Sequence, residues 1–296
     1  LARRMKFDPI PHLIGLATAA NVGSTGTITG NPQNIFIGVH SGISYLRFAA
    51  RLMPVAMLGL GLTYIVVCLV YRGRLAVPKE QDARDKDEAP TEVGHGQRLT
   101  RSRTHARLQV KAVAVTLAAV ALFFTGLPME LVALGAAAVL LLDRIKPEKI
   151  YRQVDWELLV MFTGLFIVVH AFQVHVVAGW GIEGWQWLLS RPVVFMSVVS
   201  AGLSNLVSNV PAVLLLAPVA QAVPEATRET AWLALAMSST FAGNLTVLGS
   251  VANLIVVENA RREGVPISFS EYCKVGVPLT VLTLILGILW LQFVTY

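Results

Sequence analysis

Two stretches of the sequence share the pattern T-x-x-G-[NS]-x-x-N within apolar surroundings. One reads TITGNPQN over residues 27–34, and the other reads TVLGSVAN over residues 246–253. Glycine permits unwound backbone, whose freed carbonyls attract cations while the amino ends of half-helices attract anions. Asparagine and threonine add neutral donors and acceptors and avoid the roughly 2.5–3.5 kcal/mol of inserting a charge into a membrane. The pattern predicts two broken helices that bind ions; alternatively, these small polar residues only pack helices.

A third polar stretch, SNLVSNVP over residues 204–211, interrupts another apolar block. Ser204 and Ser208 are four residues apart and are expected to share a helical face. We expect Asn209 to begin a turn and Pro211 to open the returning helix. Two hydroxyls, an amide and exposed carbonyls would suit a hard monovalent cation such as Na⁺. The alternative is a hairpin tip that its hydroxyls cap and that holds no ion.

The elements that carry these motifs belong to a membrane protein. Of the 296 residues, 55% are apolar and 14% are charged, and the mean hydropathy is +0.63; a soluble domain has about 25% charged residues. The apolar residues form blocks long enough to cross a bilayer. The sequence therefore predicts an all-α polytopic membrane protein, because a helix satisfies the hydrogen bonds of its own backbone groups in lipid. The net charge of +6 lies mainly between the blocks, so it indicates orientation and not nucleic-acid binding.

The chain divides into three parts on this interpretation. Residues 1–72 hold a broken helix and a span of a first repeat, residues 73–109 form a hydrophilic loop, and residues 110–296 form a second repeat. The second repeat contains a re-entrant hairpin at about 193–223 and a broken helix at 231–257. The continuous spans are expected at 48–71, 110–127, 129–142, 158–177 and 275–293.

The distribution of Lys and Arg predicts the orientation in the membrane. Residues 72–111 contain ten basic residues, and four more, at positions 144, 146, 149 and 152, lie between later spans. Both stretches are expected in the cytoplasm. A re-entrant hairpin then keeps Arg261 and Arg262 inside and places the C-terminus outside, with Trp180, Trp185 and Trp187 in an outer aromatic belt. The two broken helices then run in opposite directions, as in inverted-repeat secondary transporters.

Together these segments resemble the ion transporter superfamily, which includes divalent anion:sodium symporters, citrate transporters and arsenite efflux permeases. The resemblance rests on ANVGSTGTITGNPQN (20–34), VDW (154–156), SNLVSNVPAVLLLAP (204–218) and GNLTVLGSVAN (243–253). It implies that each half of the transporter chain contributes a hairpin with a Ser-Asn-Thr tip and a broken helix, which together bind the coupling cation and the anionic substrate. It also implies a homodimer. It also implies that a matching first hairpin lies just upstream of Leu1.

Pattern and resemblance together give two sets of site residues. The expected cation-binding residues are Ser204, Ser208, Asn209, Gly249, Thr246, Gly30 and Thr27. The expected substrate-binding residues are Asn31, Asn34, Asn209, Val210, Pro211, Ser250 and Asn253. At the hairpin tip Val210 replaces the family's threonine, which favours the arsenite and general anion permeases over the carboxylate carriers.

The function expected is secondary active transport of a small inorganic or carboxylate anion across the plasma membrane by alternating access. Na⁺ or H⁺ would be the coupling ion, and no cofactor or catalytic residue is expected. The first rival is an arsenite or antimonite efflux permease, which an ATPase partner can serve. A channel and a membrane-embedded enzyme are further rivals, although the sequence offers no nucleophile or metal set for the enzyme.

Other ionisable and thiol groups are given structural roles. His170 and His175 are five apart and are interpreted as packed residues rather than as a proton relay. Cys68 and Cys273 are interpreted as small apolar residues. The carboxylates near the membrane spans are expected at their ends; they are Glu130, Asp143, Asp155, Glu157 and Glu258.

Overall fold

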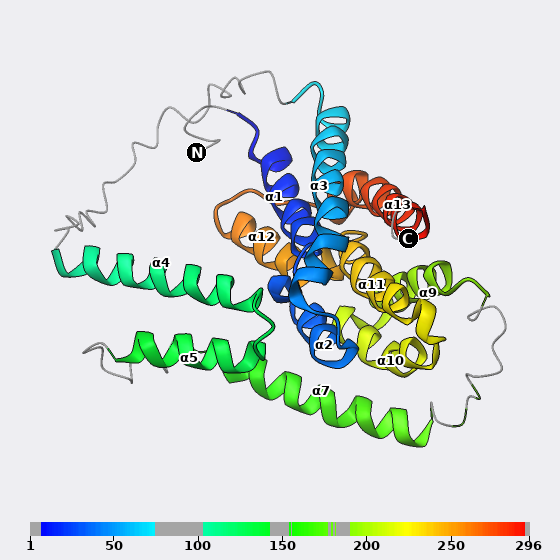
Figure 1. The fold of residues 1–296 in the computed structure, drawn as a ribbon. Coiled ribbons are helices and arrows are strands. Elements are labelled where there is room, and N and C mark those ends of the chain that lie inside the picture. The colour runs from blue at the N-terminus through cyan, green and yellow to red at the C-terminus, as the bar shows by residue number, and fades with distance from the viewer. Residues whose placement is uncertain are drawn as a thin grey trace, which may run out of the picture. The chain divides into compact units, whose positions relative to one another are not determined.

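The computed structural model describes residues 7–74, 103–142, 156–176 and 190–293, together with residues 154, 179 and 181. All regular structure in these ranges is helical (Figure 1). The chain forms two compact units, residues 1–78 with 159–296 and residues 79–158. The fold is therefore that of an all-α membrane protein, as expected.

The first polar motif interrupts a helical block as predicted. Helix α1 (Pro9–Ser24) begins where Asp8 Oδ1 accepts a hydrogen bond from the Ile10 N–H, with proline in its first turn. A short 3₁₀ turn, η1 (Ile28–Gly30), follows, and α2 (Pro32–Ser41) then resumes. Gly42 ends α2 in the left-handed conformation at φ 71°, which glycine adopts without strain.

The second motif interrupts the chain in the same manner. Helix α11 (Glu225–Ala242) is followed by η4 (Val247–Gly249) and then by α12 (Val251–Arg262). Every residue from Ala231 to Ala242 is buried, so α11 lies at the centre of the larger unit. Both predicted broken helices are thus present.

Two uninterrupted helices flank the broken ones. Helices α3 (Tyr45–Val70) and α13 (Phe269–Phe293) have the length and apolar composition of membrane spans, and they are the two such helices in the described ranges. In Figure 1, α1 packs against α3 and α12, while α11 packs against α13 and α2. Each broken helix therefore contacts a continuous span and the second half of the other broken helix.

The third motif forms a helical hairpin, with one correction. Helix α9 (Pro192–Val207) ends at Ser208, and α10 (Asn209–Ala222) starts at the next residue. Ser208 has φ 78°, so the chain reverses there and not at Asn209. The prediction that Ser204 and Ser208 share a helical face is wrong, because Ser208 lies outside α9. Pro211 does lie in the first turn of α10.

The remaining helices lie near the predicted spans. Helices α4 (Arg103–Phe123) and α5 (Met129–Leu141) form an antiparallel pair in the smaller unit, and α7 (Trp156–His175) belongs to the larger unit from Leu159 onward. Several expectations fall outside the described residues. These concern most of the 73–109 loop, the Trp belt, the basic residues at 144–152, Asp143 and Asp155.

Candidate functional site

Two buried asparagines hold the two breaks in the same way. Asn34 Nδ2 donates to the carbonyls of Ser24 (3.3 Å) and Thr27 (3.0 Å), ten and seven residues earlier. Asn253 Nδ2 donates to the carbonyls of Gly243 (2.8 Å) and Thr246 (3.2 Å), again ten and seven residues earlier. Each amide therefore satisfies the carbonyl at the end of its first half-helix, and it adds a second donor to the threonine carbonyl that already accepts from the glycine N–H of the break. These two residues position the breaks.

The glycine of each motif is required by close backbone approach. A Cβ on Gly30 would lie 2.0 Å from the Ser24 carbonyl oxygen. A Cβ on Gly249 would lie 2.8 Å from the Gly243 carbonyl oxygen. Each unwound segment thus folds back onto the end of its own first half-helix, where no side chain fits.

The two breaks are also joined to each other by reciprocal hydrogen bonds. In the register that pairs Gly30 with Gly249, Asn31 corresponds to Ser250 and Asn21 corresponds to Thr240. Asn31 Nδ2 donates to Thr240 Oγ1 at 3.1 Å. Ser250 Oγ donates to Asn21 Oδ1 at 2.8 Å. Each break therefore bonds the first half of the other helix at equivalent positions.

Asn21 is the centre of the buried network between the breaks. Its Nδ2 donates to Asn244 Oδ1 (2.9 Å) and to Asn253 Oδ1 (3.0 Å). Asn244 Nδ2 in turn donates to the Thr18 carbonyl at 3.2 Å. Because both polar atoms of Asn21 are bonded, it fixes α1 against α12 without a formal charge.

Three helices present their amino ends at the breaks and at the hairpin tip. The Asn31 side chain caps α2 by accepting from the Asn34 N–H. The Ser250 hydroxyl caps α12 by accepting from the Ala252 N–H. Ser208, at the start of α10, makes no capping hydrogen bond with its side chain. The amino end of a helix carries about half a positive charge, so these ends favour an anion.

Oxygen atoms at the hairpin tip lack partners. Ser204 Oγ, Asn205 Oδ1 and Asn209 Oδ1 are buried and have no hydrogen-bond partner among the described residues. Asn205 Nδ2 donates to the Ala242 carbonyl at 3.2 Å, which places the tip beside the second break. Oxygen donors of this kind suit a hard cation, since unpaired buried oxygens are otherwise unfavourable.

The structure brings most of the predicted residues to these two breaks and the hairpin tip. Val210 differs, because it packs in an apolar cluster with Val169 and Leu214. Sequence reasoning missed Asn21, Thr240 and Asn205. The available signal was a polar side chain inside an apolar helix, close in sequence to a glycine break for Asn21 and Thr240 and to the hairpin turn for Asn205.

We expect the reciprocal bonds to be measurable in a double-mutant cycle. Thr240→Val removes the acceptor of Asn31, so Asn31→Ala and Thr240→Val should couple by about 0.6–1 kcal/mol in the free energy of unfolding. Reversible unfolding in mixed micelles gives this value. Ser239→Ala is the matched control, since within the described part of the chain the Ser239 hydroxyl donates to the Ala236 carbonyl of its own helix. Additive effects of Asn31→Ala and Thr240→Val would contradict the contact.

Comparison with known proteins finds similar sequences over almost the entire chain. Residues 1–242 and 193–295 match the family model described as citrate transporter. The chain is 30% identical over 350 residues to silicon efflux transporter LSI3 of Oryza sativa subsp. japonica, covering 97% of this chain and 71% of that protein. It is 30% identical over 306 residues to a 46 kDa membrane protein of Mycobacterium leprae (strain TN), covering 99% and 70%. It is 36% identical over 180 residues to putative transporter arsB of Dictyostelium discoideum, covering 56% and 30%.

Proposed function

This chain belongs to the citrate transporter family, and on that premise we propose that it carries a small anion by cation-coupled alternating access. As a member of that family it is a membrane transport protein and not an enzyme. The anion, the coupling ion and the transport cycle are the proposed parts.

The reciprocal bonding of the two breaks is the observation that carries the proposal. Asn31 with Thr240, and Ser250 with Asn21, join two unwound segments that contain no formally charged residue. Such a centre provides helix amino ends for an anion, and the side-chain oxygens of the hairpin tip are available to a cation. We infer that the two broken helices are inverted repeats and that the solute binds between them and the hairpin tip.

The cation is assigned to the hairpin tip and the second break. Ser204 Oγ, Asn205 Oδ1 and Asn209 Oδ1 are the unpartnered oxygens there, and Asn205 bonds the end of α11. Na⁺ accepts neutral oxygen ligands of this kind, whereas H⁺ would need a titratable group. These groups favour Na⁺ as the coupling ion.

Removing one oxygen ligand should weaken cation binding and leave the stability of the fold unchanged. Ser204→Ala and Asn209→Ala are expected to raise the Na⁺ concentration for half-maximal uptake at least tenfold. Ser239→Ala, another buried hydroxyl, should leave it unchanged. The measurement is uptake by the full-length protein in proteoliposomes at varied Na⁺ concentration. An unaltered Na⁺ dependence in both variants would refute the assignment.

The substrate class is tested by the same preparation. Citrate, dicarboxylates, sulfate and arsenite are each supplied as substrates, with an imposed Na⁺ or pH gradient. Accumulation of one anion above its external concentration, driven by either gradient, supports the proposal. Flux that only dissipates the anion gradient would indicate a channel instead.

Efflux of arsenite or antimonite is the second candidate. The similarity to a protein named putative transporter arsB favours it, as does Val210 at the hairpin tip. In this case an ATPase partner could drive the carrier. Resistance of cells to arsenite that depends on this protein would distinguish the two candidates.

The orientation proposed with this function places loop 73–109 in the cytoplasm and the C-terminus outside the plasma membrane, in a homodimer. The re-entrant hairpin puts the segments 224–230 and 258–272, which connect the helices, on opposite sides. Labelling of single cysteines in these two segments with an impermeant reagent tests this. Reaction of both from the same side would contradict the inverted repeat.

A further inference from the structure

A charged pocket of about 340 Å³ lies where the connection between α2 and α3 meets the start of α11, in the larger unit. Its volume falls within the range of small-molecule sites. The lining consists of residues 41–44, Arg47 of α3, and Glu225, Arg228, Glu229 and Trp232 of α11. Neither the glycines of the breaks nor the residues of the hairpin tip belong to this lining. The pocket is therefore a different place from the proposed transport site.

The pocket contains two cations and two anions, and part of their binding capacity is unused. Arg47 Nε pairs with Glu229 Oε1 at 2.7 Å, while the Arg47 side chain stays 61% exposed. Arg228 Nε donates to the Val223 carbonyl at 3.1 Å. The Nη atoms of both arginines have no partner among the described residues, and Glu225 joins none of the ion pairs found there. The pocket thus offers guanidinium donors and a carboxylate, with no formal net charge.

Two hydroxyls and two helix amino ends add to the donors. Ser44 Oγ accepts from the Arg47 N–H at 3.3 Å, and Ser41 Oγ accepts from the Ile43 N–H at 3.2 Å. A hydroxyl that accepts in this way still has its own proton to donate. Arg47 and Arg228 lie close to the amino ends of α3 and α11, where the helix dipole disfavours a cation but favours a bound anion. A phosphate group fits this combination of donors.

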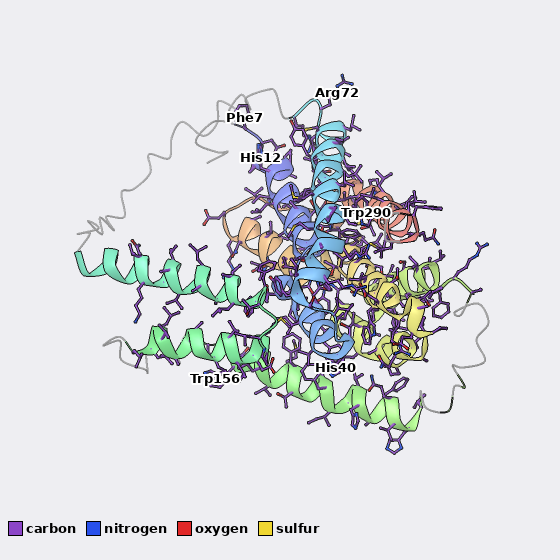
Figure 2. The ribbon with its side chains drawn as sticks, in the orientation of Figure 1. Phe7, His12, His40, Arg72, Trp156 and Trp290 are labelled. Atoms are coloured by element: carbon purple, nitrogen blue, oxygen red, sulfur yellow. The ribbon has the colours of Figure 1, made fainter. Side chains whose placement is uncertain are left out.

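The pocket lies at the depth where a membrane span meets the lipid headgroups. Arg47 belongs to the first turn of α3, which has the length and composition of a span. One turn further along α3, the Arg51 carbonyl accepts from the indole N–H of Trp290 on α13 at 3.0 Å (Figure 2). Tryptophan is enriched at the interface between membrane and water. A ligand in this pocket is therefore next to the headgroup layer.

An exposed apolar row leads from the pocket along α3 toward the middle of the span. Leu46, Ala50, Met53 and Met57 are exposed and are spaced by four, three and four residues, so they share one face of the helix. Leu46 is the sequence neighbour of Arg47, so the row begins beside the pocket. A hydrocarbon chain attached to the ligand can lie on this row, whereas a water-soluble ligand would leave it uncovered. The row therefore favours a membrane lipid as the occupant.

We propose that the pocket binds the headgroup of a zwitterionic phospholipid that carries a primary ammonium, as in phosphatidylethanolamine. The phosphate accepts from the Nη atoms of Arg47 and Arg228, because guanidinium and phosphate form strong charge-assisted hydrogen bonds. The ammonium donates to Glu225 and Glu229. A trimethylammonium head has no proton to donate to these carboxylates, and an anionic head without an ammonium leaves their charge unpaired. The bound lipid joins the connection between α2 and α3 to the start of α11.

Native mass spectrometry of the full-length protein in mild detergent tests this binding, because it counts the lipids bound to each protein. Dioleoyl phosphatidylethanolamine, phosphatidylcholine and phosphatidylglycerol are titrated separately. Glu225→Gln removes an acceptor of the ammonium, and Arg228→Gln removes donors to the phosphate. Arg261→Gln is the matched control, because Arg261 pairs with Glu258 on α12 at 3.0 Å and does not line the pocket.

We expect the wild type to bind phosphatidylethanolamine at least tenfold more tightly than the other two lipids. Glu225→Gln should bind phosphatidylethanolamine and phosphatidylcholine alike, Arg228→Gln should bind phosphatidylethanolamine at least tenfold more weakly, and Arg261→Gln should match the wild type. Equal affinity of the wild type for all three lipids, tighter binding of phosphatidylglycerol, or unchanged affinity in both pocket variants would overturn the site. Water-soluble phosphoethanolamine that binds as tightly as the lipid would assign the pocket to a free solute and also overturn it. Because this readout needs no transport, its failure is distinct from failure of the proposed function.

Discussion

Gly30→Ala is expected to abolish transport and to lower the melting temperature of the full-length protein. The added methyl group would lie 2.0 Å from the Ser24 carbonyl oxygen, and the backbone must move to admit it. Overpacking of this severity destabilises by roughly 3 kcal/mol. The measurement is thermal unfolding in detergent, followed by intrinsic fluorescence, together with anion uptake in proteoliposomes.

The glycines of the chain supply a graded comparison for this result. Gly249→Ala meets the Gly243 carbonyl oxygen at 2.8 Å and should be the milder of the two changes. Gly61→Ala, in α3, meets nothing within 4 Å and should leave both transport and melting temperature unaffected. If Gly30→Ala behaves like Gly61→Ala, the described geometry of the first break is incorrect.

Asn253→Ala should be nearly as damaging, for a different reason. It removes the donor to the Gly243 and Thr246 carbonyls and the acceptor of Asn21, all in buried surroundings. The Thr246 carbonyl keeps the Gly249 N–H, and Asn21 Nδ2 keeps Asn244 Oδ1, so the Gly243 carbonyl is the group that loses its donor. An unsatisfied buried group of this kind is unfavourable by about 1–3 kcal/mol. We expect a loss of roughly 3 kcal/mol in the free energy of unfolding, measured by reversible unfolding in mixed micelles, and uptake at least a hundredfold slower.

The control for this prediction lies on the same helix. Asn259 of α12 is exposed, so Asn259→Ala removes the same amide without freeing a buried carbonyl. It should behave as the wild type in both measurements. Equal loss of stability in the two variants would show that any amide on α12 matters, and would remove the special role of Asn253.

The sequence was sufficient for the two breaks because their cause is local. Gly30 and Gly249, each followed four residues later by an asparagine, mark places where an apolar helix cannot continue. The pattern did not predict what the asparagines do. Asn34 and Asn253 were expected at the substrate, yet both are buried against the carbonyls of the break. A repeated motif indicates a conserved geometry within the chain, but not whether its amide faces a solute or the backbone.

Contacts between segments that are distant in the chain could not be predicted from the sequence. Thr240 stands out in the sequence only as a polar residue of an apolar helix close to the second break, and it is the fold that brings it to Asn31. The hairpin turn was misplaced by one residue, because serine rarely adopts the positive φ found at Ser208 and asparagine does so more often.

Labelling of a single cysteine at the hairpin tip tests the central claim most directly. Ser208 is exposed at the turn between α9 and α10, so Ser208→Cys is introduced after Cys68 and Cys273 are replaced by alanine. An impermeant thiol reagent is applied to either face of oriented proteoliposomes. Alternating access predicts that the cysteine reacts from both faces in turn, and that Na⁺ with the transported anion slows both reactions. Labelling rates that Na⁺ and the anion leave unchanged on both faces would contradict alternating access at this site.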